Sequence, residues 1–568
     1  MKRFTALAAG TAVALALGAA NAQAERGSDG NLNVLYWQAV SVLNPYLSGG
    51  TKDVEGSSVV IEPLAKYDEA GNMVPALVDE IPTVENGGVS EDLKSITWKI
   101  TPGLLWSDGT PFTANDVKFT ADYCMAPDGG CQQISKFQDI ESIEVIDDQT
   151  VTINFTVPKP FPYTAFVGAE TPVIQKAQFE NCIGANAPNC TEQNFGPHGT
   201  GPFKVVEFRA NDVITFEANE HYRDPAKPSF ATLTLKGGGD AASAARSVLE
   251  TGEFDYAWNL QVEPEVLEQM SAAGRGQVVT SFGTSVERIE VNLTDPSPGK
   301  GENRSTLEAG PHPFLSDPAV RKALSIAIDR EILVEAGYGA SGQPTCNILP
   351  APENYASTNV NWCLEYNPDE ANRLLDEAGW APGGDGIRAK DGVRLSLLYQ
   401  TSTNSVRQAT QALVKDMWQQ IGVETELRNI DAAVFFGGDP ASPDTFQKFY
   451  ADVEMYTNNF PGTDPEAYMA GWLCDGIPSP KNGWLGANMP RFCSEEYDAL
   501  TGQMAETADL AARGEIAKKM NDILSNEGAL IPLIHRGDVS AHSVTVDGVR
   551  MNSWDSELWN VADWTRKE

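Results

Sequence analysis

The feature that most limits the fold of this chain is its length without an internal linker. A chain of 568 residues is several times the usual size of one domain, so two to four domain-sized units are expected. No stretch of low complexity is long enough to separate these units as a flexible linker. The units must therefore be joined by short crossings and packed against one another.

The N-terminus has the pattern of a secretory signal peptide. Lys2 and Arg3 precede an apolar, alanine-rich run, residues 4–20, and small residues then offer cleavage after Ala22 or Ala24. The run is shorter than the ~20 apolar residues that a membrane helix needs. We therefore expect residues 1–24 to be removed and the mature protein to be exported to the periplasm.

The charge of the chain excludes one class of partner. The formal net charge is −37 at pH 7, and an acidic surface of this kind repels nucleic acid and anionic lipid. A nucleic-acid partner is therefore not expected. The charge does not identify a ligand.

The cysteines are expected to form disulfides, because an even number in an exported chain is typical of them. Eight cysteines allow 105 connectivities, so the pairing is predicted from proximity alone. A zinc site is the alternative, but the sequence has no C-x-x-C motif or Cys/His cluster. The predicted pairs are Cys124 with Cys131, Cys182 with Cys190, Cys346 with Cys363, and Cys474 with Cys493.

The hydrophobic pattern predicts a mixed α/β chain. Strand-like stretches are expected at residues 32–37, 95–100, 143–146, 150–157, 203–217, 232–236, 254–259, 395–399 and 424–430. Helices are expected at residues 117–123, 241–250, 317–328, 368–378 and 405–421. In the second half these alternate as in an open α/β sheet. The region from residue 530 is strand-like and aromatic, and we expect it to return to the first unit.

One segment resembles a family signature. Residues 104–120 read LLWSDGTPFTANDVKFT, which is similar to the signature of family 5 extracytoplasmic solute-binding proteins. These are the oligopeptide, dipeptide and nickel receptors of ATP-binding-cassette importers. Further matches follow in the family's order, at residues 199–203, 219–222, 317–330, 367–380 and 531–533. The resemblance covers nearly all of the mature chain.

The resemblance implies an α/β fold, a two-lobed periplasmic-binding-protein clamp with mixed sheets and an extra subdomain in lobe one. We place the two crossings between the lobes near residues 279–290 and 530–536. The predicted parts are lobe one at residues 25–58 and 200–285, an inserted subdomain at 59–199, lobe two at 286–532, and a return to lobe one at 533–568.

The resemblance also implies a ligand cleft lined from both lobes. From lobe one we expect Tyr36, Trp37, Gln38, Trp258 and Asn259. Trp37 is expected to stack on the ligand and Asn259 to hydrogen-bond it. Core packing is the alternative for each tryptophan.

From lobe two, the expected ligand-binding residues are Asn458, Asn459, Phe460 and Trp472, with Glu287 and Arg288 beside the first crossing. A solvated ion pair is the alternative for the last two.

Peptide-binding members carry an aspartate just before a similar Asp-Pro, and it pairs with the α-amino group of the ligand. Pro461 or its neighbours occupy that place here, while Asp464 is expected to cap the following helix.

The sequence therefore predicts a non-enzymatic receptor, without metal or cofactor, that captures a small peptide-like solute by lobe closure. It would act as a monomer and deliver the solute to the membrane permease and ATPase subunits of an importer. An oligosaccharide or opine-like conjugate is the alternative ligand. A secreted hydrolase is the alternative class, although no G-x-S-x-G, H-E-x-x-H or Walker motif is present.

Overall fold

The computed structural model describes residues 25–437, 439, 441–460 and 462–567. The predicted signal peptide, residues 1–24, lies outside the described residues, as does Pro461. Among the described residues, no helix combines the length and the apolar character needed to cross a membrane.

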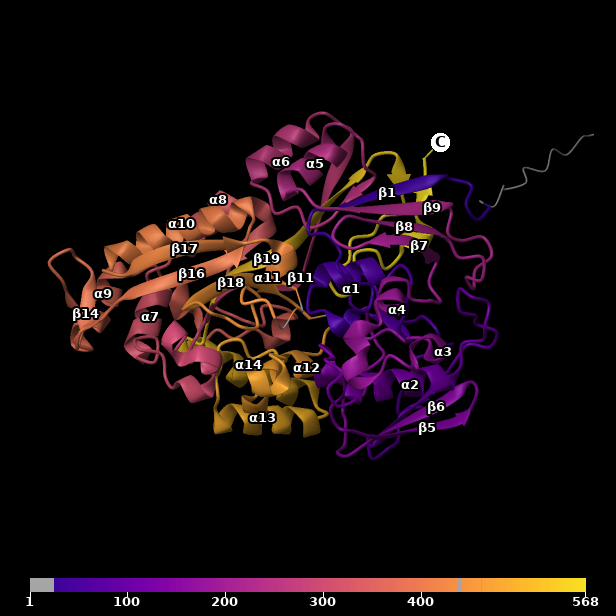
Figure 1. The fold of residues 1–568 in the computed structure, drawn as a ribbon, viewed down its shortest axis with the longest axis horizontal. Helices are drawn as coiled ribbons and strands as arrows, with labels where there is room; N and C mark the ends of the chain where they lie inside the picture. The colour runs from indigo at the N-terminus through magenta and orange to yellow at the C-terminus, as the bar shows by residue number, and fades with distance from the viewer. Residues whose placement is uncertain (1–24, 438, 440, 461, 568) are drawn as a thin grey trace, which may run out of the picture.

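One mixed sheet runs through both halves of the molecule (Figure 1). Within the described residues its strands are, in spatial order, β17 (Glu424–Ile430), β16 (Ser396–Ser402), β18 (Val453–Asn458), β11 (Gly276–Val291), β19 (Leu530–Ser543), β10 (Tyr256–Ala257), β1 (Asn31–Tyr36), β9 (Thr232–Gly237), β8 (Val213–Ala218) and β7 (Phe203–Arg209), with β12 (Gly342–Pro344) also beside β19. β1 is parallel to β9 and β10, and β16 is parallel to β17 and β18. The other neighbours are antiparallel.

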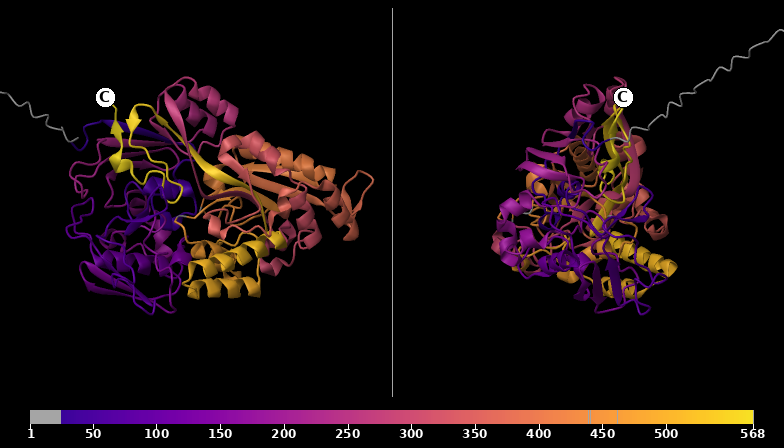
Figure 2. Two further views of the ribbon diagram at one scale, coloured as in Figure 1. Left: turned by 180° about the vertical axis from the view of Figure 1, so that it is seen from behind. Right: turned by 90° about the vertical axis from the view of Figure 1, so that its right-hand side faces the viewer.

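Two long strands join the two lobes. β11 and β19 pair antiparallel from Gly276 opposite Ser543 to Glu290 opposite Leu530, with an irregularity between Phe282 and Val286. In Figure 2, β19 runs from the lobe built from the later part of the chain into the lobe that holds the N-terminal strand. Both predicted crossings, residues 279–290 and 530–536, fall within these two strands.

Lobe one combines the N-terminal part of the chain with its C-terminal end. Its helices are α1 (Thr51–Ser57), α2 (Ala114–Met125), α3 (Lys176–Phe179), α4 (Thr191–Phe195), α5 (Ala241–Leu249) and α6 (Pro264–Ser271). Smaller sheets join β2 (Ala65–Tyr67) to β3 (Met73–Pro75), β4 (Ser95–Lys99) to β6 (Thr150–Phe155) and β5 (Ile140–Asp147), and β20 (Val546–Asp547) to β21 (Thr565–Arg566).

The predicted inserted subdomain shares a hydrophobic core with the rest of lobe one. Trp98 of β4, Leu32 of β1 and Trp564 near the C-terminus belong to one buried cluster. Trp564 packs on Tyr256 with ring centroids 5.2 Å apart. The C-terminal end therefore returns to lobe one beside β1 (Figure 1).

Lobe two has two helical layers, each with a large hydrophobic core. Its helices are α7 (Pro318–Ile326), α8 (Arg330–Gly337), α9 (Pro368–Glu377), α10 (Ser405–Gln420), α11 (Ala432–Phe435), α12 (Glu466–Met469), α13 (Glu495–Glu506) and α14 (Leu510–Glu527), and a small sheet joins β13 (Ala381–Pro382), β14 (Arg388–Lys390) and β15 (Val393–Arg394). One core lies between α7 to α10 and the sheet, with Trp418 and Tyr399 at its centre. A second core joins α12, α13 and α14 and includes Trp472.

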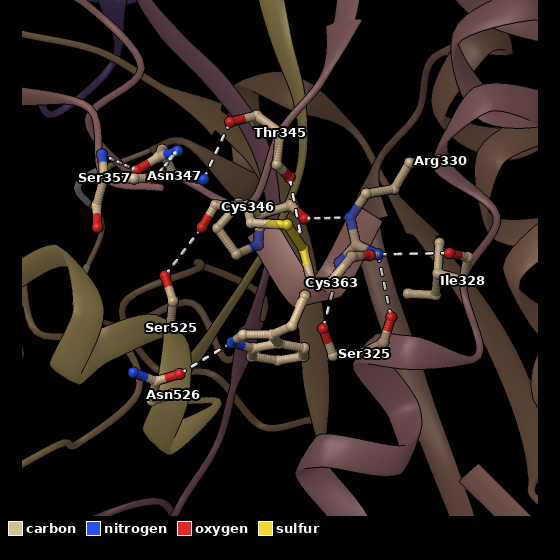
Figure 3. The surroundings of a disulfide bond; sticks show 12 residues. Ser325, Ile328, Arg330, Thr345, Cys346, Asn347, Ser357, Cys363, Ser525 and Asn526 are labelled. Atoms are coloured by element: carbon tan, nitrogen blue, oxygen red, sulfur yellow. Dashed lines mark hydrogen bonds between the residues drawn. A yellow bond between two sulfur atoms is a disulfide. The ribbon is translucent and has the colours of Figure 1, made fainter. Parts of the chain in front are cut away.

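Four disulfides join the cysteine pairs that proximity predicts, and no free cysteine occurs among the described residues. Figure 3 shows the surroundings of Cys346–Cys363. The carbonyl of Cys363 accepts a hydrogen bond from the buried Arg330, and the carbonyl of Cys346 accepts one from Ser525 of α14. This bridge therefore fastens a loop of lobe two to α8 and α14.

Candidate functional site

A cavity of about 580 Å³ lies between the lobes and is lined from both of them. Of the residues predicted to bind a ligand, those that line it are Gln38, Trp258, Asn259, Asn458, Asn459, Phe460 and Trp472. Those that do not line it are Tyr36, Trp37, Glu287 and Arg288. The fold therefore brings together predicted residues from three parts of the chain, which are Gln38, Trp258 with Asn259, and the segment from Asn458 to Trp472.

Tyr36 and Trp258 form one wall of the cavity in two layers. Their rings are stacked, with centroids 4.8 Å apart and an interplanar angle of 13°. Trp258 borders the cavity, whereas Tyr36 is fully buried beneath it and donates a hydrogen bond from its hydroxyl to Glu55. Tyr36 therefore supports the Trp258 ring.

Trp37 lies in a separate core on the other face of β1. It packs with Leu249 and other side chains of α5, and its indole nitrogen donates a 2.8 Å hydrogen bond to the backbone carbonyl of Asn259. Asn259 has φ +56°, a left-handed conformation that asparagine tolerates better than most residues. Trp37 therefore holds the backbone from which the Asn259 side chain reaches the cavity.

A cluster of two guanidinium groups and one carboxylate lies at the base of the cavity. Glu287 is fully buried and accepts hydrogen bonds from Arg407 at 2.8 Å and from the Thr457 hydroxyl. Although burial alone would raise its pKa, Arg407 holds the pKa of Glu287 below its usual value. Arg536 donates to Thr457 at 3.0 Å and to Asn259, and it forms no ion pair with any described residue.

Arg407 and Arg536 both line the cavity, and only Arg407 forms an ion pair with Glu287. The two side chains suit a ligand carboxylate, which guanidinium groups bind through two parallel hydrogen bonds.

Arg288 lies behind an aromatic wall of lobe two. Its guanidinium lies over the rings of Tyr456, Tyr468 and Trp472, at 5.5, 6.0 and 5.4 Å from their centroids. It also donates to the Tyr468 hydroxyl at 2.8 Å and to Glu290 at 2.7 Å. The three rings border the cavity while Arg288 does not, so Arg288 holds the wall from behind.

Several carboxylates of lobe one also line the cavity. They are Glu55 of α1, Asp538 of β19, and Asp555 and Glu557 of the C-terminal segment. Burial raises the pKa of each of them, and that of Glu55 to about 7. The repulsion of Glu55 and Asp538 further raises the pKa of Glu557.

Asp464 lies just before the short helix α12, whose N-cap is Pro465 and not Asp464 as the sequence predicts. Its carboxylate accepts from the backbone N–H of Glu466 at 3.0 Å and from Arg513 at 2.6 Å. Pro461, at the place of the usual ammonium-binding aspartate, lies outside the described residues.

The sequence did not single out several residues that line the cavity. These are Lys52, Glu55, Arg407, Arg536, Asp538, Asp555 and Glu557. Nothing in the sequence distinguishes these acids from the other members of a set of 78. The one available signal is that Arg536 and Asp538 directly follow the apolar first part of β19, residues 530–534.

A cavity held between two lobes, lined with charged groups of both signs and with aromatic rings, defines a two-lobed solute-binding protein. Residues 72–483 match the family described as bacterial extracellular solute-binding proteins, family 5 Middle. The chain belongs to this family of solute-binding proteins of ATP-binding-cassette importers, which are not enzymes.

Three similar proteins illustrate the family. The glutathione-binding protein GsiB of Escherichia coli (strain K12) is 25% identical over 470 residues, which cover 82% of each chain. The oligopeptide-binding protein AppA of Bacillus subtilis, solved with a nonapeptide, is 21% identical, with a TM-score of 0.81 over 96% of this chain and 100% of that one. NikZ of Campylobacter jejuni, solved with Ni(L-His), is 22% identical, with a TM-score of 0.78 over 94% and 99%.

Proposed function

We propose that this protein is the periplasmic receptor of an ATP-binding-cassette importer and captures a peptide-like solute in the cavity between its lobes. Lobe closure about β11 and β19 would bury the solute, and the closed form would then dock on the permease. The ATPase subunits of the importer would supply the energy.

The observation that carries this proposal is the chemical variety of the cavity lining. Arg536, 4% exposed and without an ion-pair partner among the described residues, offers a site for a carboxylate. Asn458 and Asn459 can donate to and accept from amide groups. The wall of Tyr456, Tyr468 and Trp472 offers a surface for apolar or aromatic side chains. A short peptide presents all three kinds of group.

Native mass spectrometry of the freshly purified mature protein would test the ligand class. The bound molecule is released by denaturation and identified by fragmentation. Peptides would support the proposal, and the Arg536→Gln variant should then retain at least tenfold less of them. A released oligosaccharide or opine-like conjugate would replace the peptide-like ligand and leave the receptor role intact. Turnover of the released molecule would contradict the receptor role.

The location and the assembly state are tested on the same sample. We expect the intact mass to correspond to cleavage after Ala22 or Ala24 and the elution volume to correspond to a monomer. A periplasmic fraction that lacks the protein would contradict the proposed location.

A further inference from the structure

We propose that Glu55 and Glu557 form a subsite in the cavity for an organic cation, an ammonium or guanidinium group of the solute. This inference deepens the proposed function and rests on the same cavity. The two carboxylates come from opposite ends of the chain, since Glu55 lies in α1 and Glu557 follows β20. The backbone N–H of Glu557 donates to Glu55 at 3.1 Å, which fixes the two residues against each other.

One carboxylate oxygen of this pair accepts no hydrogen bond from the described residues. Glu557 is 5% exposed, and its Oε2 accepts from the hydroxyls of Tyr256 and Ser540. Its Oε1 accepts no hydrogen bond from any residue that the structure describes, although the residue lines the cavity. This oxygen is not one of the sealed, unpartnered polar atoms of the described residues, so it is open to a donor from the solute. A carboxylate binds a charged N–H donor more strongly than a neutral one.

The pair also lacks a cation. Neither Glu55 nor Glu557 forms an ion pair within the described part of the chain. Lys52 of the same helix lines the cavity but pairs with Asp53 at 2.7 Å. Asp538 and Asp555 add further negative charge nearby.

Two adjacent buried carboxylates without a counter-ion are unfavourable unless a proton or a cation neutralises them. The elevated pKa of Glu55, about 7 through burial, agrees with a proton in the empty site. A bound cation would replace this proton.

The surrounding side chains favour an organic cation over a metal ion. The structure places no group of three or more metal-ligating side chains in suitable positions among the residues it describes. Trp258 borders the cavity and stacks on Tyr36, whose hydroxyl donates to Glu55 at 3.3 Å. An ammonium or guanidinium group beside Glu55 would therefore also contact an aromatic ring, which attracts cations through its quadrupole.

Matched small probes test the subsite without the natural solute. Putrescine carries two ammonium groups, and butane-1,4-diol is its neutral counterpart of the same length. Putrescine should raise the melting temperature of the mature protein in a saturable way, and the diol should not. Glu557→Gln and Glu55→Gln should each weaken putrescine binding at least tenfold. The control Glu170→Gln removes a cavity carboxylate that is already paired with Lys136 and should bind putrescine as the wild type does.

A peptide experiment separates this inference from the proposed function. A tryptic casein digest and the same digest with its amines acetylated are offered to the wild-type protein. Bound peptides that contain no arginine are counted by mass spectrometry, because acetylation does not neutralise a guanidinium group. Retention of the untreated digest, with at least tenfold less of the acetylated one, would support both proposals. Equal retention would overturn the cation subsite and keep the peptide receptor.

If putrescine binding depends on Glu557 but neither digest is retained, the cation subsite is supported and the peptide-like ligand is contradicted. If the variants do not fold, the putrescine and diol pair and the two digests still decide the outcome on the wild-type protein.

Discussion

At the scale of single residues, the lining depends on charged side chains that do not touch the cavity. Glu290 and Glu454 are cross-strand partners on β11 and β18, both fully buried. Arg288 neutralises Glu290 through a 2.7 Å ion pair, and Gln400 donates to Glu454 at 2.9 Å. Because this network lies directly behind the aromatic wall, a substitution in it should also change ligand affinity.

Arg288→Met should lower the free energy of unfolding by about 3–5 kcal/mol, because it leaves Glu290 as a buried charge without a partner. Chemical denaturation of the mature protein measures the change. The double variant Arg288→Met/Glu290→Gln should recover part of the loss, since it removes the unpaired charge as well. No recovery in the double variant would show that packing against the rings, and not charge pairing, is the role of Arg288.

Glu55 should give the empty protein a characteristic pH dependence. Its pKa of about 7 in the folded protein lies above the ordinary value of 4.5. Its stabilising contribution is therefore fully present below pH 4.5 and is lost as the pH rises through about 7. Relative to Glu55→Gln, the wild type should lose on the order of 2–3 kcal/mol of unfolding free energy between pH 5 and pH 8.

Denaturation curves of both proteins at several pH values measure this difference. The difference between the two proteins reports the Glu55 carboxyl together with its repulsion of Glu557, whose pKa it raises. If the unfolding free energies of the two proteins change with pH in parallel, the pKa of Glu55 is not elevated.

At the scale of elements, an ion pair links the predicted inserted subdomain to α12 of lobe two. Lys159, which follows β6, lies 2.8 Å from Glu466 and 2.8 Å from Asp139, and Lys159 and Glu466 are 7% and 6% exposed. Glu466 also accepts from Arg513 at 3.1 Å. If the lobes separate, Lys159 is expected to keep Asp139 and Glu466 to keep Arg513. The link can therefore open without leaving an isolated charge.

Lys159→Met should weaken solute binding about threefold to tenfold, because it removes a contact made only when the lobes are together. Affinity for a bound peptide, measured by calorimetry, reports the effect. The control Lys118→Met removes an exposed ion pair with Asp122 within α2 and should leave the affinity unchanged. An equal loss in both variants would mean that the link has no role in closure.

The Cys346–Cys363 bridge acts on stability alone, because neither cysteine lines the cavity. Its loop spans 17 residues, for which the chain-entropy estimate is about 3 kcal/mol. Cys346→Ala/Cys363→Ala should lower the free energy of unfolding by about this amount and leave solute affinity unchanged. A loss of affinity at temperatures where the variant is folded would contradict this separation.

At the scale of the whole molecule, β11 and β19 are the only long strands, among the residues described, that run through both lobes. The irregularity between Phe282 and Val286 interrupts their pairing near the middle. A closure motion is therefore expected to bend the sheet at this place, where fewer ladder hydrogen bonds resist it.

Small-angle X-ray scattering should show a smaller radius of gyration with solute than after the solute is removed by partial unfolding and refolding. Lys159→Met should shift the empty protein further towards the larger value. An unchanged radius in both states would contradict capture by lobe closure.

The sequence by itself determined the family and much of the local structure. The strands at β1, β6, β9 and β17 and the helices α5, α7, α9 and α10 lie where the hydrophobic periods predict them, because those periods are local. The disulfide pairs followed from short separations in sequence. The sequence did not predict the long strand β11 or the helices α13 and α14. Their apolar side chains form a buried face only when other helices and strands pack against them.

The tertiary structure alone decided which charged residues meet. Glu55 and Glu557 are about 500 positions apart, and Arg536 meets Asn259 across two segments of the sheet. The tertiary structure also decided that Trp258 lines the cavity and that Trp37 does not. Trp37 follows Tyr36 directly in the sequence, but its side chain lies in a separate hydrophobic core. Successive side chains of a strand point to opposite faces, and only the layers packed on those faces decide which one meets the ligand.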